Sequence, residues 1–90
     1  MEFIKQTNQI YVENEKGQRI AEVTFPDVED GVVNMNHTFV DHSLRGQGVA
    51  GQLLEEAAIQ LRAQKKQAIP TCSYAVQWFE KHPEYSDVLK

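Results

Sequence analysis

The sequence has little of what builds disulfide frameworks, membrane spans or nucleic-acid sites. Its single cysteine, Cys72, cannot form a disulfide within the chain and fits a reducing compartment. No apolar run approaches the roughly 18 residues that a membrane-spanning helix needs. Lysine and arginine number 9 against 13 aspartates and glutamates, and the net charge of −4 argues against general binding to nucleic-acid phosphates.

The first residues also lack the pattern of a secretory leader. Met1 to Gln6 contains no basic region followed by an apolar one. We therefore expect a cytoplasmic protein that binds neither membranes nor nucleic acid, and we predict no metal site. The chain has 90 residues, of which 41% are hydrophobic, so we expect a single domain over residues 1–90.

The first half of the chain has the alternating hydrophobic pattern of β-strands. Ile10–Val12 and Ala21–Phe25 predict two strands joined by a turn at residues 15–18. After a second turn at residues 26–31, a third strand is predicted from position 33. Alternation along that strand places four side chains on one face: Val33, Met35, His37 and Phe39.

The second half has the period of helices. Val49, Leu53, Ala57 and Leu61 recur at spacing four, which predicts a long helix that packs on the sheet. Residues 67–71 predict a short, irregular strand because they contain a proline, and residues 73–82 predict a second helix. We also expect one helical turn at residues 84–89. The predicted fold is α+β: an antiparallel meander, a glycine turn, a helix, a strand and a helix.

The glycine turn matches two phosphate-binding patterns at once. Gly46–Gly51 spells G-x-G-x-x-G and nearly spells a P-loop, but Gln52 and Leu53 stand where the P-loop needs lysine and serine or threonine. A Rossmann fold would place this fingerprint after its first strand and an acidic residue near position 72, and neither holds here. What remains is a helix start that offers free N–H groups to an anion, most simply a phosphate.

The same residues carry a resemblance to a known family. Arg45-Gly46-Gln47-Gly48-Val49-Ala50 is similar to the signature of the GNAT superfamily of acyl-CoA-dependent N-acetyltransferases, and it stands in the usual place between a strand and a helix. The stretches "HTFVDHSLRGQGVAGQLLEEA" and "IPTCSYAVQWFEKHPEYSDVL" resemble very short, single-domain GNAT-like proteins. The resemblance covers Ile10 to Leu89.

The resemblance implies a site for acetyl-CoA or coenzyme A. It implies that the backbone of the turn holds the pyrophosphate and that the strand before the turn, at Phe39 and Val40, pairs with the pantetheine arm. The thioester would then lie in a cleft between this strand and the strand that ends at Thr71. The implied turn residues are Arg45, Gly46, Gln47, Gly48, Val49, Ala50 and Gly51.

Three residues near this cleft are candidates for catalysis. Cys72 precedes a helix start, where the dipole lowers a thiol pKa, so it could receive an acetyl group, line the thioester site or simply be a buried thiol. His37 is the best candidate for the general base, although a histidine on an apolar face is usually structural. Tyr74 could protonate the departing thiolate, as a tyrosine does in many GNAT enzymes, or bury its ring.

Length is the chief departure from the family. Full-size GNAT enzymes carry helices that cover the acceptor, and this meander leaves no room for them. Either the acceptor is large, such as a protein lysine or N-terminus, or a second subunit of a homodimer completes the site. We expect an acetyl-CoA-dependent N-acetyltransferase that works by direct attack of an amine on the thioester. The alternatives are a non-catalytic acyl-CoA-binding module or accessory subunit, and an interaction domain without ligand.

Overall fold

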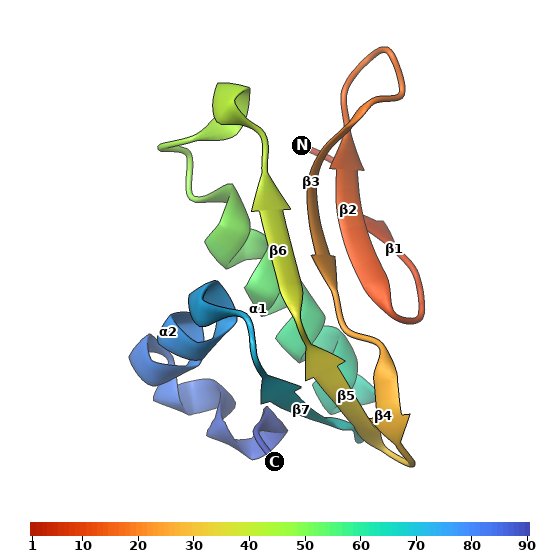
Figure 1. Cartoon of the computed structure of the whole chain (residues 1–90), viewed down its shortest axis with the longest axis vertical. Helices are drawn as coiled ribbons and strands as arrows, with labels where there is room; N and C mark the ends of the chain where they lie inside the picture. Colours follow the sequence, from red (N-terminus) through yellow and green to blue (C-terminus); the bar gives the residue numbers. More distant parts are fainter.

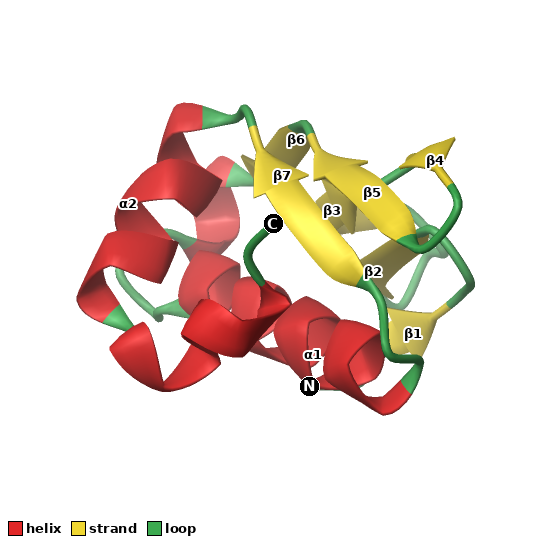
Figure 2. Cartoon of the chain, turned by 90° about the horizontal axis from the view of Figure 1, so that it is seen from below, coloured by secondary structure: helices red, strands yellow, loops and turns green.

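The computed structural model describes residues 1–90 as strands backed by helices on one side (Figures 1 and 2). The strands are β1 (Ile4–Lys5), β2 (Gln9–Glu13), β3 (Arg19–Thr24), β4 (Asp27–Glu29), β5 (Val32–Met35), β6 (His37–Val40) and β7 (Gln67–Pro70). The helices are α1 (Val49–Ala63) and α2 (Ser73–Lys81), with 3₁₀ segments η1 (His42–Leu44) and η2 (Pro83–Val88). The predicted α+β class is confirmed, and the predicted strands, helices and C-terminal helical turn occur in the expected order, with two additional strands and one divided strand.

The strands form two small sheets. One is antiparallel with the order β1-β2-β3-β6, and the other has the order β4-β5-β7, in which β5 and β7 run parallel. The helix α1 connects the β6 end of the first sheet to β7 of the second, as a parallel pairing requires a crossover. The alternating residues of β2 and β3 that were predicted to be apolar pack against α1 in one core.

The predicted third strand is divided at Asn36, where the chain changes its pairing partner. Met35 is the last residue of β5 to pair with β7, and the N–H of Asn36 turns instead to the carbonyl of Thr24 at 3.3 Å. The switch also changes which residues face the core. Val33 and Met35 are fully buried, whereas His37 is exposed and Phe39 is 42% exposed.

The prediction that His37 and Phe39 share the apolar face of Val33 and Met35 is therefore wrong. A simple alternation assumes one uninterrupted strand, and the change of partner at Asn36 breaks its phase. In β6 the half-buried side chains are Thr38 and Val40. Two other strands were not predicted. β1 has only two residues, and β4, in the predicted turn at 26–31, is exposed along its whole length and has no alternating pattern.

The helix α1 buries the predicted stripe. Leu53, Ala57 and Leu61 are fully buried, and the helix ends where Lys65 adopts a left-handed conformation with φ of +59°. The N–H groups of Lys65 and Lys66 bond back to the carbonyls of Arg62 and Leu61, the pattern of a Schellman ending. Neither helix is long and apolar enough to cross a membrane.

The C-terminal segment is tied to α1 and α2 by aromatic and charged side chains. Trp78 and Phe79 are buried, and their rings meet edge to face at 5.1 Å between centroids. Tyr85 is buried beside Trp78 and donates its hydroxyl to Glu55 at 3.2 Å. Arg62 holds both carboxylate oxygens of Asp87, at 2.8 and 2.6 Å. These contacts fix α2 against α1, and so fix one wall of the site described next.

Candidate acetyl-CoA site

The approach to the glycine turn is fixed by a capped 3₁₀ segment. The Asp41 carboxylate accepts hydrogen bonds from the Ser43 hydroxyl at 2.6 Å and the Ser43 N–H at 3.0 Å. These bonds, the hydroxyl first, hold the pKa of the Asp41 carboxyl below its usual value. The chain therefore leaves β6 in a defined direction before it reaches Arg45.

The turn itself depends on left-handed backbone at two glycines. Gly46 has φ of +83° and Gly48, the residue that precedes α1, has φ of +70°. Glycine adopts this conformation without the penalty that a Cβ brings. Five backbone N–H groups at the start of α1 have no acceptor within the chain, and no acidic side chain caps the helix: they belong to Gly46, Gly48, Val49, Ala50 and Gly51.

Gln47 does not share this geometry. Its N–H donates to the carbonyl of Leu44 at 3.3 Å, and Gln47 does not line the groove that begins at the turn. The free N–H groups and the positive end of the α1 dipole give this turn the chemistry of an anion site.

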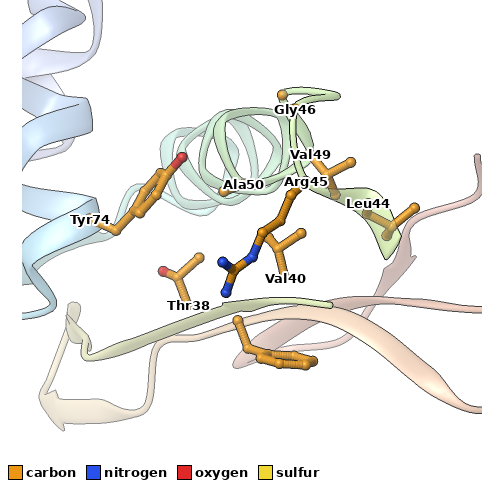
Figure 3. A pocket seen from close by; sticks show the side chains of 10 residues that line it. Thr38, Val40, Leu44, Arg45, Gly46, Val49, Ala50 and Tyr74 are labelled. Atoms are coloured by element: carbon orange, nitrogen blue, oxygen red, sulfur yellow. The ribbon is translucent and has the colours of Figure 1, made fainter. Parts of the chain in front are cut away.

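A groove of about 450 Å³ runs from the turn between β6 and the start of α1 (Figure 3). Arg45 extends across it and makes no salt bridge, so its guanidinium is free to bind an anion. The ten lining residues are Thr38, Phe39, Val40, Leu44, Arg45, Gly46, Gly48, Val49, Ala50 and Tyr74. A phosphate at the turn and an apolar arm along β6 would fit this lining.

The wall that β6 contributes is an unpaired strand edge. The N–H of Asp41 donates to Ile20 in β3 at 2.7 Å, so alternation directs the backbone groups of Phe39 to β3 and those of Thr38 and Val40 to the groove. The same alternation turns the Phe39 ring to the opposite face of the sheet. Phe39 therefore borders the groove only with backbone atoms, and its N–H and carbonyl are directed to β3. Val40 offers the groove a free N–H, a free carbonyl and its side chain.

At its far end the groove reaches the point where β6 and β7 separate. The carbonyl of Met35 accepts the N–H groups of both Thr71 and Cys72, at 3.1 and 3.3 Å, and beyond this point the two strands diverge. We call this point the fork. The Cys72 sulfur lies in it, 3.7 Å from the Thr38 hydroxyl oxygen. Thr38 therefore belongs both to the lining of the groove and to the fork, whereas no residue of β7 lines the groove.

Cys72 is half-buried in the fork and precedes the first residue of α2. Burial raises the pKa of its thiol, but hydrogen bonds from the Ala75 N–H and the Thr38 hydroxyl outweigh this effect. The pKa of Cys72 is therefore lower than that of an ordinary thiol. Tyr74, in the first turn of α2, is 53% exposed and lines the groove beside the fork.

His37 lies next to the fork but on the other face of the sheet from Thr38. Its Nε2 is 3.0 Å from a carboxylate oxygen of Glu22 in β3. We assign the Nε2 proton to this bond, which leaves Nδ1 as the proton acceptor of the neutral ring. The pair has the geometry of a base held by a carboxylate.

Thr38 and Glu22 are the site residues that the sequence did not single out. Neither a threonine nor a glutamate stands out in a strand. The roles of Thr38 and Glu22 depend on which residues lie opposite them in the sheet. Glu22 lies opposite Phe39 in the β3–β6 pairing, two residues from His37 and on the same face, and Thr38 meets Cys72 across 34 residues of sequence. Only the strand register could have revealed them.

Comparison with known families and structures identifies the family of the chain. The family model for GCN5-related N-acetyltransferases matches residues 9–88. The NMR solution structure of a GCN5-like candidate N-acetyltransferase from Staphylococcus aureus superposes with a TM-score of 0.82 at 31% identity, over 99% of this chain and 87% of that one. The chain belongs to the GCN5-related N-acetyltransferase family, the GNAT superfamily that the sequence resembles.

Two larger structures share the fold over part of their length. The GNAT family N-acetyltransferase YhbS from Escherichia coli, crystallised with CoA, matches at a TM-score of 0.61 and 29% identity, over 69% of this chain and 38% of its own. An acetyltransferase from Bacillus cereus matches at a TM-score of 0.67 and 23% identity, over 90% of this chain and 56% of its own. No curated protein sequence matches the chain.

Proposed function

We propose that this protein is an acetyl-CoA-dependent N-acetyltransferase in which an amine attacks the thioester directly. The observation that carries the proposal is a continuous path: five unpaired N–H groups at the glycine turn, a groove along the free edge of β6, and the fork at Cys72. Membership of the family and the CoA complex of YhbS support the same assignment.

Each part of the path has its own task. The turn and Arg45 would hold the pyrophosphate, and the backbone of Val40 would pair with the pantetheine amides. Bound acetyl-CoA supplies an activated acetyl group. Nδ1 of His37 would take the proton that an ammonium must lose before it is a nucleophile, and the Tyr74 hydroxyl would give a proton to the departing sulfur. The Cys72 sulfur would contact the acetyl end in the fork.

A test of the phosphate site should use Gly51 and not Gly48. A side chain at Gly48 would strain the left-handed backbone, whereas Gly51 is helical and a Cβ there would only touch Trp78 at 3.8 Å. Gly51→Glu puts a negative charge in the first turn of α1. It should raise the midpoint of thermal unfolding without ligand, since glutamate is the better helix former by roughly 0.5–1 kcal/mol and suits the dipole.

Acetyl-CoA should stabilise this variant less than it stabilises wild type. At 100 times its dissociation constant, the ligand adds about 2.7 kcal/mol to wild type, a shift of roughly 10 °C or more, and this shift should shrink in Gly51→Glu. The neutral variant Gly51→Gln should keep it. Equal shifts in the two variants would contradict a phosphate site at the turn. Binding without acetylation of any amine would leave a non-catalytic acyl-CoA-binding module.

A further inference from the structure

Arg19 extends the pair of His37 and Glu22 by one more charged side chain. A guanidinium nitrogen of Arg19 lies 3.3 Å from one carboxylate oxygen of Glu22, and Nε2 of His37 lies 3.0 Å from the other. Because Ala21 and Val23 point into the core against α1, alternation turns Glu22 away from α1. We call this side of the β1-β2-β3-β6 sheet the open face.

Arg19 reaches the open face because the strand pairing is irregular beside it. Alternation from Ala21 would turn the Arg19 side chain inward, to the face that packs on α1. The register of β2 and β3 shifts between Val12 and Glu13, however, and Glu13 pairs with Arg19 instead of Ile20. A β-bulge changes the direction of the side chains next to it. The bulge therefore brings a cation to the carboxylate that holds His37.

Two neighbours on β2 hold the Arg19 side chain in place. The central carbon of its guanidinium lies 3.7 Å from the centroid of the Tyr11 ring, and Nη1 donates to the side-chain oxygen of Gln9 at 2.8 Å. A guanidinium that is stacked on a ring and hydrogen-bonded loses much of the freedom of a surface side chain. The charge of Arg19 is therefore held beside Glu22.

This charge affects the protonation of His37. A carboxylate beside an imidazole favours the charged imidazolium, which can accept no further proton, and a nearby cation opposes this effect. The Glu22 side chain is only 21% exposed, so solvent screens these contacts less than it screens a fully exposed pair. No ion pair links Glu22 or His37 to a helix or to the second sheet, and the titratable group that faces Glu22 from β2 is the phenol of Tyr11.

We propose that Arg19 is a positioning residue for the base His37: it occupies one oxygen of Glu22, and its charge favours the neutral imidazole whose Nδ1 can accept a proton. This proposal rests on the acetyltransferase function above. During turnover one proton of the substrate ammonium moves to Nδ1 and then to solvent, while Nε2 keeps its proton on the side of Glu22. Arg19 itself gains and loses no proton.

The His37 ring can be titrated by NMR whether or not the protein is active, and His37→Gln identifies its signal. Arg19→Gln should raise the pH midpoint of this titration by about half a unit at low salt, the effect of a unit charge about 6 Å away in water. Arg19→Lys keeps the charge and should keep the midpoint, and Glu22→Gln should lower it. Lys5→Gln removes a cation that pairs with Glu56 of α1, on the other face of the sheet, and is the matched control. An unchanged midpoint in Arg19→Gln would overturn the proposal.

The pH profile of kcat links this titration to catalysis. With saturating acetyl-CoA and n-butylamine, the first of a panel of alkyl amines, kcat of Arg19→Gln should fall about threefold at about pH 5.5 and match wild type at about pH 9. An equal fall at both pH values would indicate a merely structural role and overturn the proposal. A raised midpoint without the loss at low pH would overturn it as well. No acetylation of any amine by wild type would overturn the acetyltransferase function itself, a result distinct from an unchanged NMR midpoint.

Discussion

The pKa of the Cys72 thiol is lowered by its surroundings, and the reactivity of this thiol can be measured directly. Because hydrogen bonds in the fork lower its pKa, the rate of alkylation by iodoacetamide should rise with pH at a lower midpoint than for an ordinary thiol. Thr38→Val removes a hydroxyl partner and should move the midpoint up. Thr71→Val, whose hydroxyl bonds to Asn34, is the matched control.

The same assay reports whether Cys72 lies at the acyl end. Acetyl-CoA should slow alkylation in wild type, since Thr38, which lines the groove, lies 3.7 Å from this sulfur. Alkylation that is indifferent to acetyl-CoA would show that the thioester does not reach the fork. An unchanged midpoint in Thr38→Val would contradict the role given to that hydroxyl.

His37 and Glu22 should affect turnover without affecting cofactor binding. His37→Gln removes the proton acceptor, and kcat at neutral pH should fall about 10²- to 10⁴-fold. Glu22→Gln keeps the histidine but loses the charge that orients it, so kcat should fall less. The dissociation constant of acetyl-CoA should stay the same in both variants.

The control for this pair is His42→Gln, an exposed histidine in η1 that does not line the groove. Its kcat should match wild type. If His37→Gln also turns over at the wild-type rate, the proton must leave by another route, such as a chain of water molecules.

At the scale of elements, the end of α1 carries a measurable strain. Lys65 has φ of +59°, a conformation that glycine adopts at far lower cost, so Lys65→Gly should stabilise the fold by about 0.5–1 kcal/mol. For a domain of this size the thermal midpoint should rise by several degrees. Gln64→Gly, one residue earlier in ordinary helical backbone, should lower it. Equal changes of the thermal midpoint in Lys65→Gly and Gln64→Gly would contradict backbone strain at Lys65.

The elements differ in how well a sequence predicts them. The helix α1 has a strong period and a glycine boundary, and the strands β2 and β3 alternate clearly, so all three were predictable. The break at Asn36 was not predictable, because apolar and polar residues alternate without interruption from Val33 to Phe39 when His37 is counted on the apolar side. The fork, and the faces to which His37 and Thr38 turn, follow from that break.

At the scale of the whole molecule, the sequence by itself determined the order of the main elements, the family and the place of the glycine turn that we propose as the anion site. These depend on local patterns: hydrophobic period, glycines that allow left-handed backbone, and a helix start that follows them. Only the tertiary structure decided how the chemistry is divided between the two faces of the sheet. The exchange of pairing from β7 to β3 at Asn36 places Cys72 with Thr38 and His37 with Glu22. Such long-range pairings depend on register, which no local pattern encodes.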